Sequence, residues 1–561
     1  MDLKILQNHL VNICHEMAKA MMRTAYSPIF NEALDFCTIL LDRDGELLAM
    51  ADMCPAMLGS GALSGKWIIE ELGSDSFEPG DVVVDNDPYR GMCHMPEHLL
   101  LTPFFYGGEL QGFIGNVAHV GEIGGMAPGS FASNATDIYQ EGLRLPPVKL
   151  VRRGEYAHDV WKIMLANHRT PDNSWGDFNA MIGSLHIGLR RMTELFDRHG
   201  VEHMQHSYID LLDYAEQWMR NEIRNLPNGM YEAEDAMEDD GVEDRSHWIR
   251  IRLVIKDEDI IVDFTGTDPM ARGPINAPYT VTFAASCNGF FQLFRDFPLN
   301  AGTYRPIQVI APSGSLVNVV HPAPCVAGQT EMQPRIIDLI QGACLSQAVP
   351  DLVAASCGGT CSNFLFGGVH PETGRYYTNY HYDGMGFGAR RTHDGNAALN
   401  VPHGNCPNTP IEIFETRFPF RHIRYSLRPD SGGPGRQRGG MGIIRELEVV
   451  ADEITVSALY ERMTLSPWGI HGGLEGQRTE LLVRRAGTQE YLDFAKAFGV
   501  KSAAKFTNVR LERGDRVLIK TPGGGGYGPP AERATEAIEH DLKEGWISSQ
   551  AAQAAYGSRA D

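Results

Sequence analysis

Two apolar runs around a glycine pair constrain the fold of this chain more than any other feature. Residues 99–106 and 112–118 are apolar and flank Gly107-Gly108, which is a turn signal. The pattern predicts two antiparallel strands joined as a hairpin. His94 lies just before the first strand and His119 just after the second. Because the open ends of a hairpin meet, we expect these two histidines to lie close together in space.

Other polar residues gather around the same hairpin mouth: Asn86, Asp87, Glu97, His98 and Glu122. Imidazole and carboxylate groups that converge at strand ends suit a divalent metal ion. The spacing also allows a simpler interpretation, in which these are polar residues of a solvated loop. His94 with Glu97, or His119 with Glu122, would then be ordinary surface pairs.

A second hairpin is predicted nearer the N-terminus. Residues 35–41 and 47–51 are strand-like, and Asp44-Gly45 makes the turn between them. Asp35 opens this hairpin. From its position alone, Asp35 is a polar residue at the end of a strand.

The remaining chain divides into a helical part and a strand-rich part. Apolar residues at helical spacing predict helices over 3–25, 158–198 and 201–225. From Gly229 the period becomes two, which predicts strands over 248–255, 260–264 and most of 443–520. Residues 523–526 are four glycines, and we expect a flexible elbow there, before a final helix at about 532–545.

A chain of 561 residues is too long for one hydrophobic core. We therefore expect a mixed α/β (α+β) multi-domain chain with mainly antiparallel sheets and peripheral helices. The expected domains are 1–225, carrying the metal site, a central β-rich 226–420 that completes the pocket, a C-terminal β-rich 421–530 and a helical tail, 531–561.

Composition narrows the classes of function. A net charge of -22 argues against a nucleic-acid partner. No apolar run is long enough to span a bilayer, and the N-terminal segment lacks the apolar core of a signal peptide. The ten cysteines form no CxxC pair, so we expect reduced thiols in a cytoplasmic protein. Cys93 adjoins His94 and is either a ligand or nucleophile, or a small buried residue.

Several motifs match a known family in order along the chain. They are Asn86-Asp87-Pro88-Tyr89 with Gly91 and His94, Ala118-His119, Glu122-Ile123-Gly124-Gly125, Pro128-Gly129-Ser130, and Glu141-Gly142 through Pro146-Pro147-Val148-Lys149-Leu150. In these motifs the chain closely resembles the B component of the hydantoinase and oxoprolinase family. Ketone carboxylase subunits, for acetone and acetophenone, are related to that family.

The resemblance implies a site with one divalent metal, zinc or manganese. Its ligands would be Asp35, His94 and His119, with Glu122 as the fourth ligand or as a partner of a ligand. Catalytic roles are implied for Asp87, Glu122 and Arg335. The chain departs from the family pattern at Met57 and Val120, where relatives commonly carry histidine. These departures bear on the substrate more than on the metal.

Two further groups are candidates for substrate binding. Asn167 and Arg169 lie in a loop between two predicted helices, and Arg suits an anionic substrate. The alternative is a helix-capping loop with a surface arginine. Gln329 and Glu331, with Arg335, open a predicted helix whose N-terminus could contact substrate. The alternative there is a capped helix with a structural salt bridge.

The implied function is that of a catalytic B subunit of an ATP-dependent cyclic amide hydrolase. The substrate would be phosphorylated by a separate ATP-binding A-type subunit in a hetero-oligomer, because no P-loop or kinase signature occurs in this sequence. One alternative is a subunit of an ATP-dependent ketone carboxylase. Another is a non-catalytic scaffold for the A subunit, which would not need Asp35, His94 and His119 to meet at one point.

Overall fold

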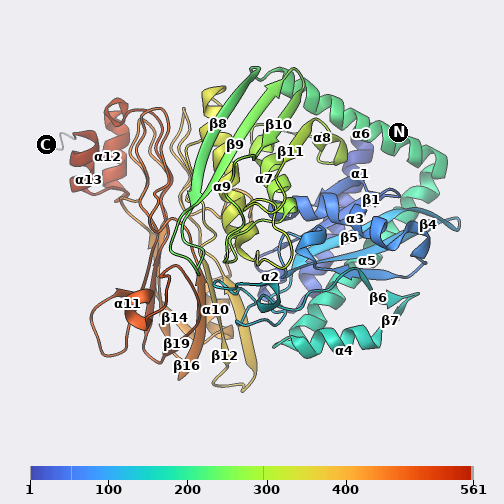
Figure 1. Cartoon of the computed structure of the whole chain (residues 1–561), viewed down its shortest axis with the longest axis horizontal. Helices are drawn as coiled ribbons and strands as arrows, with labels where there is room; N and C mark the ends of the chain where they lie inside the picture. Colours follow the sequence, from blue (N-terminus) through green and yellow to red (C-terminus); the bar gives the residue numbers. More distant parts are fainter. Residues whose placement is uncertain (1, 52, 295, 558–561) are drawn as a thin grey trace.

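The computed structural model describes residues 2–51, 53–294 and 296–557. It confirms a mixed α/β fold with mostly antiparallel sheets. Figure 1 shows the N-terminal sheet and its helices at one end of the molecule and the strands of the C-terminal part at the other. The sheet that contains β8 and β9 lies between them in this view.

A seven-stranded antiparallel sheet forms the N-terminal part, in the order β2-β1-β5-β4-β3-β6-β7. Its strands are β1 (Phe36–Asp42), β2 (Leu47–Ala51), β3 (Val82–Asp85), β4 (Glu97–Tyr106), β5 (Glu109–His119), β6 (Val148–Arg152) and β7 (Glu155–Tyr156). The pairs β4–β5 and β1–β2 are the two predicted hairpins, and both are confirmed.

Helices pack against this sheet and confirm the predicted helical segments. They are α1 (Leu3–Thr24), α2 (Pro28–Asn31), α3 (Leu58–Leu72), α4 (His158–Asn167), α5 (Pro171–His199) and α6 (Val201–Arg224). α1 packs on α5 and on β1 and β2. Packing is close at Gly188 of α5, where an added Cβ would lie 2.6 Å from Ile114 and 2.7 Å from Met17.

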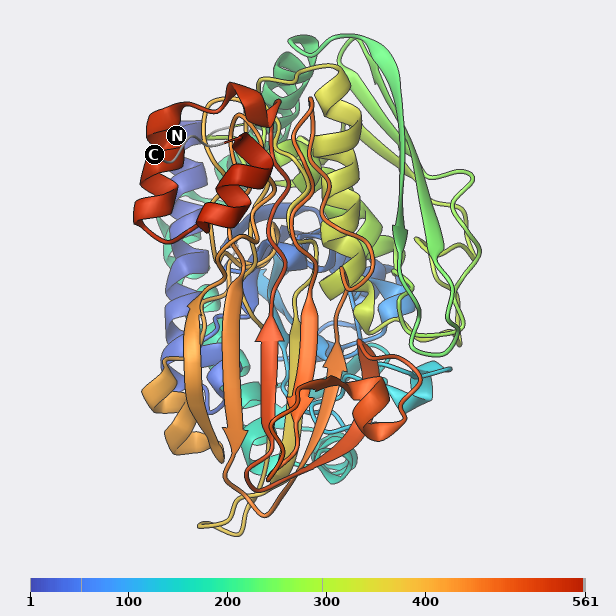
Figure 2. The same cartoon turned by 90° about the vertical axis from the view of Figure 1, so that its left-hand side faces the viewer.

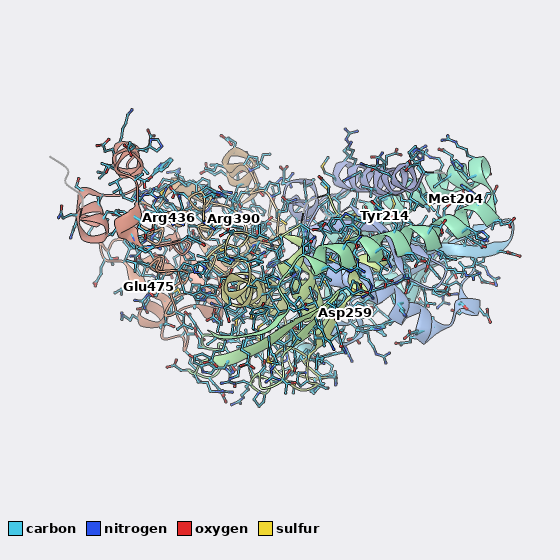
Figure 3. All side chains as sticks on the ribbon, turned by 90° about the horizontal axis from the view of Figure 1, so that it is seen from above. Met204, Tyr214, Asp259, Arg390, Arg436 and Glu475 are labelled. Atoms are coloured by element: carbon cyan, nitrogen blue, oxygen red, sulfur yellow. The ribbon has the colours of Figure 1, made fainter. Side chains whose placement is uncertain are left out.

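The second sheet has the order β11-β10-β9-β8. It confirms the strands predicted after Gly229, where apolar residues recur at every second position. Alternate residues of β9 are buried. Its strands are β8 (Gly229–Met237), β9 (His247–Lys256), β10 (Asp259–Asp263) and β11 (Ile307–Ile310). In Figure 3, Met204 and Tyr214 mark α6 and Asp259 marks β10. Arg220 of α6 pairs with Asp259 at 2.6 Å, which ties the helix to the sheet.

The central part also contains α7 (Tyr279–Phe291), α8 (Ala301–Tyr304) and a longer helix that includes α9 (Gln333–Asp338). α8 packs on α6, and α7 packs on α9. The longer helix begins with π-helical turns at Gly328–Met332 and continues with π-helical turns at Leu339–Cys344. The predicted helix therefore exists, and Gln329 and Glu331 lie in its first turns.

Two more sheets form the C-terminal part, with the orders β13-β12-β16-β19 and β14-β15-β20-β17-β18. Figure 2 shows their long strands facing the viewer. The strands are β12 (Asn363–Val369), β13 (Tyr376–His381), β14 (Phe420–Leu427), β15 (Ile443–Val449), β16 (Glu453–Leu459), β17 (Glu480–Arg484), β18 (Leu492–Asp493), β19 (Lys505–Glu512) and β20 (Arg516–Lys520). Because β12 pairs with β16, strands from both sides of the expected 420/421 boundary share one sheet.

The remaining helices are α10 (Ile411–Arg417), α11 (Phe494–Phe498), α12 (Thr535–Lys543) and α13 (Ser549–Tyr556). α12 corresponds to the predicted final helix, and α12 and α13 pack together above the C-terminal strands (Figure 2). Residues 558–561 of the expected tail lie outside the described residues. Across the described ranges, no helix combines the length and the apolar character needed to cross a membrane.

The four glycines at 523–526 do not form the expected elbow. They are buried, and none of the four has a positive φ. Their backbone lies between other extended segments: Gly524 N donates to Gly440 O at 3.0 Å, and Gly525 N donates to Ser356 O at 2.9 Å. An added Cβ at Gly524 would lie 2.0 Å from Phe387 O. Glycine is required here for space and not for φ freedom.

Replacing Gly524 with alanine should therefore destabilise the protein. The methyl group would overlap a carbonyl that cannot move freely, and overpacking of this kind costs about 1–3 kcal/mol or more. Urea denaturation measures the loss. Gly183→Ala is the matched control, because nothing lies within 4 Å of an added Cβ on this helical residue. Equal stability of the two variants would contradict the close packing.

Candidate metal centre

The register of three strands brings Asp35, Glu97 and His119 to one end of the N-terminal sheet. Phe36 of β1 pairs with Ala118 of β5, so Asp35 lies beside His119. The backbone N–H of His119 donates to Asp35 O at 3.1 Å. Glu97, the first residue of β4, pairs with His119 across the hairpin. The pairing of these strands therefore brings the strand ends together, as predicted.

His94 joins this group from the loop before β4. Its Nδ1 lies 3.1 Å from the carbonyl oxygen of Val326, and its ring centroid lies 5.1 Å from that of His119. If Nδ1 carries the hydrogen and donates to Val326, then Nε2 presents its lone pair, which is the arrangement of most metal-binding histidines. His94 Nε2 lies 3.9 Å from Glu97 Oε1.

Asp35, His94 and His119 line one small cavity of about 30 Å³, which is large enough for one water molecule or one ion. Other parts of the chain close it. They contribute Cys54 and Ala56, Gln329 and Thr330 of the helix that begins at Gly328, Cys361, Tyr380, Tyr382, Asn400, Val401, His403, Gly404 and Cys406. Tyr380 stacks on His119 with ring centroids 5.1 Å apart.

Burial sets the protonation state of these groups. It raises the pKa of Asp35 to about 6 and lowers that of His94 to about 4. Burial, together with the charge of Asp35, raises the pKa of Glu97 to about 8. Burial also lowers the pKa of His119 well below its usual value. Both imidazoles are therefore neutral at pH 7, as metal ligands must be.

The donor set fits a divalent cation. His94 Nε2 and His119 Nε2 are buried and have no hydrogen-bond partner. Such atoms are costly unless something satisfies them. No lysine or arginine occurs among the described residues that line the cavity, so nothing there balances the carboxylate of Asp35. Asp35, His94 and His119 line this cavity together, with Glu97 behind them, and are candidate ligands. Among the described residues, however, the potential ligand atoms that lie within 4.8 Å of one another are those of Asp35, Cys54 and Cys406.

Gln329 connects the sheet to the helix that closes the cavity. Its side-chain amide donates to Glu97 Oε1, and Ser60 Oγ donates to Glu97 Oε2 at 3.2 Å. Of the residues expected to bind substrate, Gln329 is the one that lines the cavity.

Glu122 and Arg169 lie together but do not line the cavity. Arg169 donates to Glu122 Oε1 at 2.9 Å and to Gly125 O at 2.5 Å, and Glu122 also accepts from Gly129 N at 3.0 Å. The pair fixes the glycine-rich loop that follows His119. Asn167 is exposed, and its side chain donates to Ile163 O in its own helix. Arg169 is thus neither a surface arginine nor part of the cavity lining, and neither Arg169 nor Asn167 caps a helix end.

Asp87 also lies outside the cavity lining. It caps the turn at Pro88–Arg90 by accepting from Tyr89 N at 3.0 Å, and it pairs with Arg144 at 3.1 Å. The neighbouring Asn86 donates to Met95 O at 2.8 Å, which holds the loop that carries His94. These contacts give the Asn-Asp motif a positioning role.

Arg335 and Glu331 are fully buried and do not line the cavity. Arg335 pairs with Glu461 at 3.0 Å and with Asp235 at 3.4 Å. Burial opposes ionisation of Asp235, but Arg462 and Arg335 outweigh it and lower its pKa to about 2. Glu331 accepts from Asn363 Nδ2 at 2.8 Å. The ion pair of Arg335 with Glu461 is the kind of structural salt bridge that the sequence left open as an alternative.

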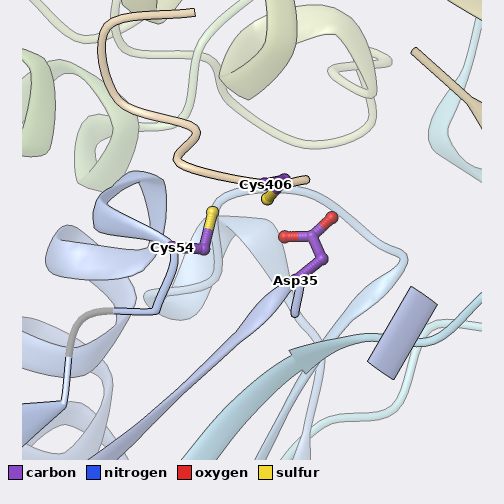
Figure 4. Close-up of side chains that lie close together, drawn as sticks. All are labelled: Asp35, Cys54 and Cys406. Carbon is purple, nitrogen blue, oxygen red and sulfur yellow. The ribbon is translucent and has the colours of Figure 1, made fainter. Parts of the chain in front are cut away.

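Sequence reasoning missed two cysteines at the site. The ligand atoms of Asp35, Cys54 and Cys406 all lie within 4.8 Å of one another (Figure 4). Cys93, which the sequence singled out, is buried against Ser60 and does not line the cavity. Cys54 and Cys406 are far apart in sequence and belong to no local motif, so only the folded chain relates them.

A sequence model of one family, described as hydantoinase B/oxoprolinase, matches residues 1–530. The chain belongs to this family. An uncharacterized protein of Methanocaldococcus jannaschii is 36% identical to this chain over 556 residues, or 99% of this chain and 95% of that one. Caprolactamase subunit beta of Pseudomonas jessenii is 31% identical over 574 residues, or 99% and 95% of the two chains.

Solved structures show the same hydantoinase B fold. The ATP-dependent caprolactamase from Pseudomonas jessenii superposes with a TM-score of 0.92 at 29% identity, over 100% of this chain and 96% of that one. Acetone carboxylase gives a TM-score of 0.89 at 19% identity, over 99% and 79% of the two chains. The second likeness shows a shared fold.

The buried contacts of Arg335 predict a structural effect when it is replaced. Arg335→Gln removes a cation from both Asp235 and Glu461, while Arg462 and Lys505 remain near them. Breaking a buried pair costs about 3–5 kcal/mol, and we expect a loss near the lower end. Urea denaturation measures it.

The control is Arg245→Gln, because Arg245 forms an exposed pair with Glu243. Its loss should be under about 1 kcal/mol. A stable Arg335→Gln protein that has lost turnover would instead support the catalytic role that the sequence implied for Arg335.

Proposed function

We propose that this chain is the catalytic B subunit of an ATP-dependent cyclic amide hydrolase, with one divalent cation held by Asp35, His94 and His119. The observation that carries the proposal is the pair of buried, unpartnered Nε2 atoms on His94 and His119, two residues that line the same cavity as Asp35. The Asp35 carboxylate lies 3.9 Å from Nδ1 of His119. The family relationship adds support, because the caprolactamase it resembles is described as ATP-dependent.

When bound, a divalent cation would polarise a carbonyl or phosphoryl oxygen and lower the pKa of bound water. The residues of this chain orient and tune the site. The Val326 carbonyl fixes the ring of His94, and the Tyr380 ring covers His119. Burial and the charge of Asp35 raise the pKa of Glu97 in the metal-free chain, and a bound cation would lower it again. Glu97 lies 3.9 Å from His94 Nε2, so its carboxyl group is next to a proposed ligand.

The substrate would approach from a larger open pocket next to the small cavity. This pocket has a volume of about 620 Å³, the size of a site for a small organic molecule. Asn400, Val401 and Cys406 line both spaces, so the segment around them separates the pocket from the Asp35 cavity. A substrate in this pocket would reach the cavity if that segment moved aside.

ATP would be used on an A-type partner subunit. The relative in Pseudomonas jessenii is named as one subunit of its enzyme, and this sequence carries no P-loop. The chain would then act within a hetero-oligomer and receive a phosphorylated cyclic amide. Hydrolysis would complete the reaction at the Asp35 cavity.

The second candidate is a subunit of an ATP-dependent ketone carboxylase. The aromatic residues beside the site are compatible with it: Phe131 lies behind the cavity lining, packs on His94 and His119 and stacks on Tyr380. Such residues suit a flat enolate as well as a lactam ring. The two candidates share the metal site and differ in the nucleophile that reaches it.

Isolated protein should show no turnover, because the substrate must first be phosphorylated by the partner. Adding the A-type subunit and ATP should produce ring-opened product from a lactam or hydantoin. A panel that includes acetone and acetophenone with bicarbonate separates the two candidates. ATP-independent turnover by this chain alone would contradict the proposal that a partner subunit must first phosphorylate the substrate. A complex that forms with the A-type subunit but shows no turnover would favour a scaffold.

Metal content should depend on the two cavity histidines. His94→Ala and His119→Ala each remove a buried nitrogen ligand, and we expect the bound metal, measured by elemental analysis, to fall from one per chain to near zero. His206→Ala is the control, because His206 is exposed on α6. Melting curves establish that the variants are folded. Full metal content in the double variant of His94 and His119 would exclude this site.

A further inference from the structure

We propose that Cys54 and Cys406 supply thiolate ligands to the cation at Asp35, so that this centre selects zinc over manganese. The inference rests on the proposed function for the existence of a metal at this cavity. It goes further by naming two ligands that no sequence motif indicated.

Three potential ligand atoms from distant segments of the chain lie close together. Cys54 follows β2, Cys406 lies between β13 and α10, and Asp35 precedes β1, yet their ligand atoms lie within 4.8 Å of one another. Figure 4 shows the three side chains converging on one point. Two atoms bound to one tetrahedral zinc ion at about 2.0–2.3 Å lie roughly 3.3–3.8 Å apart, so atoms at the 4.8 Å limit would have to approach by about 1 Å. The three groups therefore need only a small adjustment to share an ion.

The two thiols are buried in a cavity whose described lining has no lysine or arginine. Cys54 is 3% exposed and Cys406 is 9% exposed. Both line the same cavity as His94 and His119, whose Nε2 atoms are buried and unpartnered. None of the described lining residues is lysine or arginine, so only a bound cation could balance thiolates there. Two imidazoles, one carboxylate and two thiols thus surround a space of about 30 Å³.

The type of ligand decides which metal the site prefers. Imidazole and carboxylate ligands alone accept zinc and manganese alike, whereas thiolate is a soft ligand that favours zinc and disfavours manganese. On binding, each thiol would release its proton to solvent as the metal–sulfur bond forms. The thiols must be reduced for this, which fits a pair that is held as free cysteines.

Cobalt provides a direct readout that does not depend on activity. The metal-free full-length chain is loaded with Co²⁺ under reducing conditions, and thiolate ligation gives an intense near-ultraviolet charge-transfer band. We expect that band in the native protein and in the control Cys287→Ala, a buried cysteine of α7. The variant Cys54→Ala/Cys406→Ala should lose the band and, in competition between Zn²⁺ and Mn²⁺, should lose zinc preference by roughly tenfold or more.

Each outcome decides the proposal. A native protein without the band, or a double variant with unchanged zinc preference, overturns it. So does a Cys54–Cys406 disulfide that persists under reducing conditions, detected by thiol counting and mass spectrometry. If His94→Ala abolishes metal binding while the cysteine variant behaves as native, the result supports the metal site of the proposed function and contradicts ligation by Cys54 and Cys406. Melting curves of the double variant guard against unfolding, and the single variants Cys54→Ala and Cys406→Ala repeat the test if it unfolds.

Discussion

The register between β1, β5 and β4 is the constraint on which the site depends. Phe36 pairs with Ala118, and Glu97 pairs with His119, so Asp35, Glu97 and His119 reach the same sheet end. Successive side chains of a strand point to opposite faces, and a slip of one residue would turn these groups away from one another. The long apolar runs of β4 and β5, buried along most of their length, fix that register through the core.

The site also needs the C-terminal part of the chain, because Cys361, Tyr380 and Cys406 close the cavity. Buried ion pairs hold the parts together. Glu461 pairs with Lys505 at 2.8 Å and with Arg335 at 3.0 Å, which links the C-terminal sheet to the helix that carries Gln329. Within this arrangement the cavity is the place where buried acidic and neutral donors meet without a lysine or arginine in its described lining. The proposed cation would be the positive partner of these donors.

Local patterns predicted the hairpins, the N-terminal helices and the placing of His94 near His119, since each depends on residues close in sequence. Partners far apart in sequence could not be predicted in this way. Glu122 and Arg335 carry charges that suit a site, but Arg169 and Glu461 neutralise them in the folded chain. Cys54 meets Cys406 only because two distant loops converge. The glycines at 523–526 indicated freedom of φ, whereas the fold uses their lack of a side chain.

Anomalous diffraction tests the central claim most directly. Crystals of the protein grown with zinc, measured on both sides of the zinc absorption edge, would locate every bound ion without reference to activity. The account predicts one peak in the cavity, at about 2.0–2.2 Å from His94 Nε2, His119 Nε2 and the Asp35 carboxylate. A fully occupied zinc site elsewhere, with the two Nε2 atoms bonded only to protein or water, would contradict it.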